Sequence, residues 1–112
     1  RIKKMYYNRS DSSDSNLLYF IQDNDNSYVE SLYLPNMSSL YGSSRNDTIQ
    51  KIKNLVFSSS TPPSSISNYY GYRNTSTRTI WCPQGSLDAY TAKFGNSWII
   101  KETDSNGEIT TD

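Results

Sequence analysis

Residues 80–90 read IWCPQGSLDAY, and together with the TPP tripeptide at residues 61–63 they carry the strongest structural signal in the chain. Three apolar residues form a short buried strand, and the Pro-Gln-Gly that follows favours a turn. Ser86 then stands where a helix N-cap is expected, directly before an amphipathic run. The stretch therefore predicts a strand, a turn and a helix in immediate succession.

The predicted helix ends near Phe94-Gly95. Leu87, Tyr90 and Phe94 recur at the spacing of one helical face, so we expect them to be buried. Glycine favours a left-handed exit from the helix, which Gly95 would provide. Trp98 follows in a last apolar patch. These elements predict a C-terminal helical cap over residues 83–100, with its structural residues at Ser86, Leu87, Tyr90, Phe94 and Trp98.

Short apolar strands recur along the chain at a regular spacing. They contain Leu32, Leu55 and Ile80, and a weaker unit of the same kind lies earlier, at Met5. All three intervals between these positions fall in the range of roughly 20–29 residues that is typical of leucine-rich repeats. In such repeats each unit adds one strand to a stacked parallel sheet, so we expect the same arrangement here.

Stacking of these units predicts which side chains share a face. Because side chains alternate along a strand, Leu32, Leu55 and Ile80 should form one internal ladder, with Leu34, Phe57 and Cys82 forming a second. Tyr33, Val56 and Trp81 should then point to the opposite, outward face.

Several of these motifs together resemble the closing repeat of the BspA-like leucine-rich repeat family, whose irregular repeats occur on surface proteins of anaerobic commensal bacteria. The matching positions are residues 55–57 (LVF), 61–63 (TPP), 80–83 (IWCP), Gly85-Ser86 and Tyr90. Cys82 departs from the pattern, in which Val is usual. The resemblance implies a β-rich solenoid of the α/β repeat class, in which short parallel strands of an irregular leucine-rich repeat stack beneath a C-terminal helical cap.

The expected organisation is a solenoid fragment with its cap over residues 1–100 and a polar tail or linker over residues 101–112. The chain begins with Arg1, and we expect it to be a piece of a longer polypeptide. No apolar run approaches the roughly 20 residues that span a bilayer, so no transmembrane segment is predicted.

Charge and composition exclude several function classes. Eleven basic and eleven acidic residues balance, which argues against a large nucleic-acid interface. The absence of histidine removes imidazole acid–base chemistry, and a single cysteine, Cys82, excludes an internal disulfide and a multi-cysteine zinc site. Asp23 begins a sequence like a calcium loop, but Tyr28 stands at the sixth position, where that loop needs glycine. We therefore expect no catalytic residues, no metal and no cofactor, and Cys82 as a buried, inert thiol.

Aromatic residues provide the candidate contact surfaces. Tyr70, Tyr72 and Arg73 lie in a long polar loop, and rings beside a guanidinium and hydroxyls are typical of protein or carbohydrate recognition. An alternative is that Tyr69 or Tyr70 is an inward core residue. Tyr33 and Trp81, on the outward face of the sheet, form a second candidate set.

These patterns favour a non-enzymatic binding or adhesion module of an extracellular or bacterial cell-surface protein, which recognises a protein, matrix or glycan surface. The alternative is a structural or host-attachment component of a phage virion, which would contact other virion proteins. The abundance of Ser, Thr and Asn suits an exported β-rich module, although an AT-rich genome explains the high Asn, Tyr, Ile and Lys content equally well.

Overall fold

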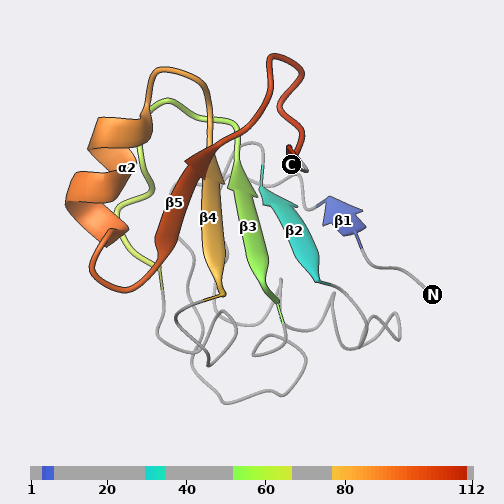
Figure 1. Cartoon of the computed structure of the whole chain (residues 1–112), viewed down its shortest axis with the longest axis horizontal. Helices are drawn as coiled ribbons and strands as arrows, with labels where there is room; N and C mark the ends of the chain where they lie inside the picture. The colour runs from blue at the N-terminus through green and yellow to red at the C-terminus, as the bar shows by residue number, and fades with distance from the viewer. Residues whose placement is uncertain (1–3, 7–29, 35–51, 67–76, 111–112) are drawn as a thin grey trace.

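The structure is a computed structural model and describes residues 4–6, 30–34, 52–66 and 77–110. In these ranges a parallel sheet and one helix form a small α/β arrangement (Figure 1). The elements in chain order are β1 (Lys4–Tyr6), β2 (Ser31–Leu34), β3 (Asn54–Phe57), β4 (Thr79–Cys82), α2 (Leu87–Phe94) and β5 (Ile99–Glu102).

The five strands lie side by side in chain order, and every neighbouring pair is parallel. Leu32 pairs with Leu55, and Leu55 pairs with Ile80, so the predicted stacking of these three residues in adjacent parallel strands is confirmed. Met5 of β1 pairs with Leu32, as the weaker fourth unit predicted. The repeat spacing therefore predicted the register of the sheet as well as the existence of its strands.

One face of the sheet carries the main hydrophobic core. Both predicted ladders are buried in one cluster, to which Ile52, Tyr90 and Trp98 also belong. Cys82 is a free, buried thiol, as predicted, and its burial raises its pKa. Strands this short bury a substantial apolar face because they pair side by side in one sheet.

Helix α2 follows Ser86 at its N-cap, as predicted, and places the fully buried Tyr90 against the core. The Tyr90 hydroxyl donates a 2.6 Å hydrogen bond to the carbonyl of Ser59, just before the TPP tripeptide. Its ring lies 5.9 Å from that of Phe57. Tyr90 thus joins the helix to the end of β3 and to the connection that follows it, and burial raises the pKa of its hydroxyl.

Three predicted details of the cap are wrong. Leu87 is 38 % exposed, because a helix of eight residues has barely two turns and its packing is centred on Tyr90 and Phe94. The Ser86 side chain accepts no hydrogen bond from a helical N–H, and its hydroxyl instead donates to the Pro83 carbonyl at 2.6 Å. Gly95 has a right-handed φ of −63°, since its N–H continues the helical bonding to Thr91.

The last strand extends the ordered part of the chain beyond the predicted cap. The expected boundary between residues 100 and 101 falls inside β5, which ends at Glu102. The chain then turns at residues 104–108 and crosses the sheet on the side opposite the core, where Ile109 packs against Tyr33, Val56 and Trp81 (Figure 1). Residues 103–110, called the strap below, were predicted as a tail or linker and instead cover part of the sheet.

None of the helices in the described ranges has the length and apolar character needed to cross a membrane.

Candidate functional site on the outer face of the sheet

The outer face of the sheet is the face opposite the main core. The strand register places two rows of side chains on it. The upper row, toward the carboxyl ends of the strands, consists of Tyr6, Tyr33, Val56, Trp81 and Lys101. The lower row consists of Lys4, Ser31, Asn54, Thr79 and Ile99. The upper row is thus aromatic or apolar in its middle and flanked by an exposed tyrosine and a lysine.

The middle of the upper row is covered. Tyr33 and Trp81 each retain only 5 % exposure, and Val56 retains 1 %. Ile109 of the strap packs on these three residues. Tyr33 and Trp81 therefore occupy the predicted face, but their prediction as exposed binding residues is corrected, because the strap shields them from solvent.

A chain of polar contacts fixes the lower part of this face. The indole N–H of Trp81 donates to the Asn54 side-chain oxygen at 2.9 Å, and the Asn54 amide donates to the Ser31 hydroxyl at 3.1 Å. The three residues come from β4, β3 and β2. Buried indoles need such a partner, so Asn54 holds the Trp81 ring in one orientation.

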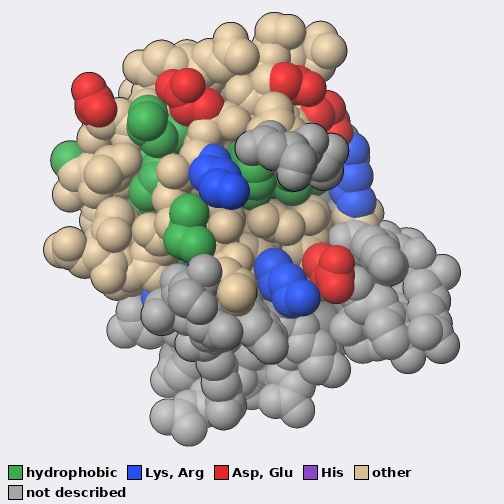
Figure 2. Space-filling model, viewed as in Figure 1, with side chains coloured by type: hydrophobic (Ala, Val, Ile, Leu, Met, Phe, Trp, Pro, Cys, Tyr) green, Lys and Arg blue, Asp and Glu red, His purple; other side chains and the backbone are tan. Residues whose placement is uncertain are grey.

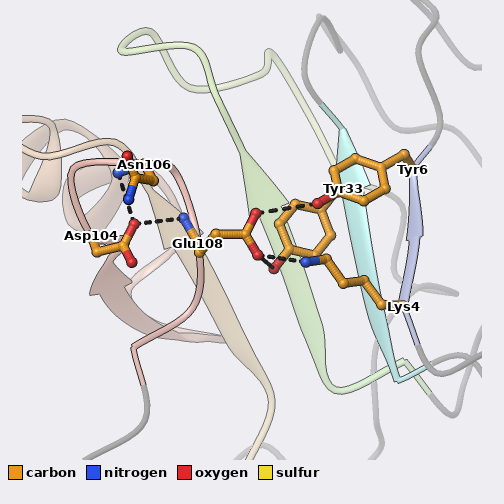
Figure 3. Close-up of polar contacts among 6 residues, drawn as sticks. All are labelled: Lys4, Tyr6, Tyr33, Asp104, Asn106 and Glu108. Carbon is orange, nitrogen blue, oxygen red and sulfur yellow. Dashed lines mark hydrogen bonds and ion pairs between the residues drawn. The ribbon is translucent and has the colours of Figure 1, made fainter.

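Glu108 ties the strap to the first two strands (Figure 3). Its carboxylate pairs with the Lys4 ammonium and accepts hydrogen bonds of 3.2 Å from the hydroxyls of Tyr6 and Tyr33. The Tyr6 and Tyr33 rings stack with their centroids 4.5 Å apart, and Lys4 lies 4.7 Å from the Tyr33 centroid. The single carboxylate thus holds together three side chains that belong to β1 and β2.

The charges of this cluster support one another. The hydrogen bond from Lys4 holds the pKa of Glu108 below its ordinary value, and the same contact raises the pKa of Lys4. Burial, and then the nearby Glu108 charge, raises the pKa of Tyr33. All three shifts favour a charged carboxylate and ammonium beside a neutral phenol at neutral pH.

The turn that aims Glu108 at the sheet has a recognisable sequence, Asp104-Ser105-Asn106-Gly107. Asp104 Oδ1 accepts hydrogen bonds from the backbone N–H groups of Asn106 and Glu108, at 2.8 and 3.0 Å (Figure 3). Gly107 has a φ of +77° and donates its N–H to the Asp104 carbonyl. A turn that closes with a left-handed glycine is a common three-residue hairpin loop. This pattern could have predicted from the sequence that the chain reverses direction after β5. No comparable pattern pointed to Lys4 or Tyr6 as residues of the site.

The exposed part of the outer face lies around the covered centre. Tyr6 is 53 % exposed at one end, and at the other end the exposed Lys101 lies 5.6 Å from the Trp81 ring centroid. Figure 2 views this face and shows hydrophobic side chains together with both basic and acidic ones. The surface is therefore mixed, with no large field of one sign among the described residues.

The other predicted residues fall in two groups. Among the cap residues, Ser86, Tyr90 and Trp98 are buried, Phe94 is half-buried, and Leu87 is exposed. The Arg78 guanidinium covers the Trp98 ring at 4.5 Å and donates to the Ser97 carbonyl. Tyr70, Tyr72 and Arg73 lie outside the described residues, so their role as a contact loop stays a prediction.

Within the described ranges, no cluster of three or more His, Cys, Asp or Glu side chains is placed to hold a metal ion. The chemistry of the outer face is that of contact and hydrogen bonding by hydroxyl, amide, ammonium and aromatic groups.

Comparison with known proteins adds no assignment to this geometry: no family model, no curated protein and no solved structure matches the chain.

Proposed function

We propose that this chain is part of an irregular leucine-rich repeat solenoid of the BspA-like type, acting as a non-enzymatic binding module of a bacterial cell-surface or secreted protein. Strands β2, β3 and β4 recur at intervals within the leucine-rich repeat range, and each neighbouring pair is parallel and in register, which supports the repeat assignment. The bond from the inward Tyr90 to the connection holding the TPP tripeptide supports a structural role for the family-like motif.

The observation that carries the binding function is the outer face itself. Five adjacent strands and the strap that covers their middle form one surface, with Tyr6 exposed at one end and Lys101 at the other. Repeat proteins bind through extended surfaces of this kind, and tyrosine supplies large contact area with few rotatable bonds. Tyr33 and Trp81 support this surface from beneath the strap. Tyr70, Tyr72 and Arg73 are proposed as a second contact set.

The partner is a macromolecular surface, namely a host protein, a matrix protein or a glycan, and no nucleic acid. With a formal charge of zero the chain has little long-range field to screen. Affinity for the partner should therefore depend only weakly on salt, in contrast to a phosphate-binding protein.

Binding of the parent chain and its variants to a glycan array and to a matrix-protein array tests this function. The Tyr6→Ala, Lys101→Ala double variant should lose at least tenfold in affinity for the ligand that the parent chain captures. Lys93→Ala provides the matched control, because Lys93 is exposed on α2 and lies off the outer face. Its binding should equal that of the parent.

Two results would overturn the proposal. One is a captured ligand whose affinity is the same for the double variant and the parent. The other is an empty array together with tight assembly onto phage capsid or tail proteins, which would identify a virion component instead.

A further inference from the structure

The turn at the start of the strap contains a chemically labile pair, Asn106-Gly107. It is the one Asn-Gly dipeptide in the whole sequence. Both residues are exposed, so water reaches the asparagine side chain and the backbone beside it. Asn106 lies beside Asp104, on the side of the turn away from the tyrosine rings of the Glu108 cluster (Figure 3).

The residue that follows an asparagine controls how readily the asparagine side chain reacts with the backbone. The backbone nitrogen of that next residue attacks the side-chain carbonyl carbon, and a bulky side chain on it hinders the approach. Gly107 has no Cβ, so its nitrogen is unhindered and its backbone reaches the widest range of angles. Asn96 is also exposed, but Ser97 follows it, so Asn96 lacks this advantage.

The closed turn holds the attacking nitrogen in place. The Gly107 N–H donates to the Asp104 carbonyl at 3.0 Å, and the Asp104 carboxylate accepts the N–H groups of Asn106 and Glu108. The attack therefore requires the turn to open. Exposed turns with few apolar contacts open locally at a small cost in free energy, so the reaction is accessible without unfolding of the sheet.

We infer that Asn106 is a site of spontaneous deamidation whose product releases the strap from the outer face. The Gly107 backbone nitrogen loses its proton and forms a bond to Cγ of Asn106, and the side-chain nitrogen leaves as ammonia. The result is a five-membered succinimide ring. Water then adds to one of the two ring carbonyls and breaks its C–N bond, which gives either aspartate or isoaspartate. The only co-reactant is water, and no electrons are transferred.

The isoaspartate product alters the turn that aims Glu108 at the sheet. Its backbone runs through the former side chain, which inserts one extra carbon atom between Asp104 and Gly107. The hydrogen bonds from Gly107 and Glu108 back to Asp104 then lose their geometry. Either product also adds a carboxylate two residues from both Asp104 and Glu108, and like charges this close repel.

Release of the strap would uncover the middle of the outer face. Ile109, which packs on Tyr33, Val56 and Trp81, follows directly after Glu108. A turn that no longer directs Glu108 toward Lys4 also no longer positions Ile109. This inference goes beyond the proposed function, because the reaction and its effect on the strap need no partner.

Peptide mapping by mass spectrometry tests the modification in the whole chain, incubated in its native state at mildly alkaline pH. Asn106 should gain the mass that corresponds to replacement of its NH2 group by OH, with isoaspartate as a product. Asn96 is the internal control in the same digest and should react at least tenfold more slowly. An unmodified Asn106, or equal rates at Asn106 and Asn96, would overturn the inference.

Two variants test the chemistry and the role of the turn. Asn106→Gln should slow the reaction at least tenfold, because the longer side chain has to close a six-membered ring. Asp104→Ala removes the carboxylate that holds the turn closed and should speed deamidation of Asn106 at least threefold. A rate in Asp104→Ala no higher than in the parent would contradict a reaction that depends on opening of the turn.

Tryptophan emission in a Trp98→Phe background tests the release of the strap. Trp81 emission should shift to longer wavelength as isoaspartate accumulates, whereas Asn106→Gln incubated alongside should keep its spectrum. Asn106→Asp carries the added charge on a backbone of normal length and should shift less. Deamidated protein with an unshifted spectrum would overturn the release, and so would a melting temperature that falls as far as that of a Tyr90→Ala variant, which would indicate unfolding. Neither measurement uses a ligand, so both outcomes are independent of the array experiment.

Discussion

The two faces of one sheet are held together by different interactions. On the inner face, Leu32, Leu55 and Ile80 pack among the members of a single buried hydrophobic cluster. On the outer face, the alternate residues of the same strands form a cluster of three buried side chains, covered by the strap through Ile109. Glu108 holds the strap against Tyr33 through a hydrogen bond, and Asn54 accepts a hydrogen bond from the Trp81 indole beneath the strap.

This difference indicates how each face responds to change. The inner face depends on apolar burial, which is insensitive to pH and is lost only when the whole unit unfolds. The outer face depends on a short strap whose polar contacts are exposed, and such segments open locally with a small free energy. We therefore expect the inner face to determine the stability of the fold and the outer face to respond to conditions and to ligands.

The largest effect is expected at Tyr90, on the inner side. Tyr90→Ala removes a fully buried ring and its bond to Ser59, and should lower the free energy of unfolding by about 3–5 kcal/mol. Tyr90→Phe keeps the ring and should lower it by about 1 kcal/mol. Chemical denaturation of both variants measures the difference. Equal stability of Tyr90→Ala and the parent chain would show that the helix does not pack on the sheet.

A smaller effect is expected at Ile109, on the outer side. Ile109→Ser removes the half-buried contact of the strap and should lower stability by about 1 kcal/mol. The larger effect of this variant should be a local change in the environment of Trp81. In a Trp98→Phe background only Trp81 fluoresces as a tryptophan, and its emission should shift to longer wavelength as the strap exposes it. An unshifted spectrum would mean that the strap does not shield Trp81.

Acid should release the strap without unfolding the sheet. The folded-state pKa of Glu108 is depressed, so the stabilisation from its ionised form is present above the ordinary glutamate pKa and is lost as pH falls through the lower, folded-state value. We expect the Trp81 emission to shift in that acidic range, below the ordinary pKa of glutamate. Glu108→Gln should show the released spectrum at neutral pH and no such transition. An unchanged pH profile in this variant would assign the transition to another carboxylate.

The smallest effect is expected at Leu87, which the helical pattern placed in the core and the structure places in solvent. Leu87→Ser should change the free energy of unfolding by no more than about 0.5 kcal/mol. Phe94→Ser, one helical turn after Tyr90 on the half-buried side of the same helix, should lower it more. A loss for Leu87→Ser that matched the Phe94 variant would show that the first helical turn also packs.

The candidate site was predictable only in part. The repeat spacing placed Tyr33 and Trp81 on the outer face correctly, because alternation along a strand is a local property. Their burial was not predictable from that alternation, since it depends on where the chain goes after β5. The Asp104-Ser105-Asn106-Gly107 turn signalled a reversal of the chain, but no local pattern showed that Glu108 would meet Lys4, 104 residues away in the sequence.

Sequence patterns alone predict the strands at residues 32–34, 55–57 and 80–82, their parallel register, the inward ladders and the helix after Ser86. Each follows from a short-range rule: a side-chain period of two, a spacing between units, or a helix-start signal. Three features appear only in the assembled fold: the strap covers Tyr33 and Trp81, Leu87 is exposed, and one cluster joins Lys4, Tyr6, Tyr33 and Glu108. These outcomes depend on contacts between segments distant in the sequence, whose geometry is set only when the sheet has assembled.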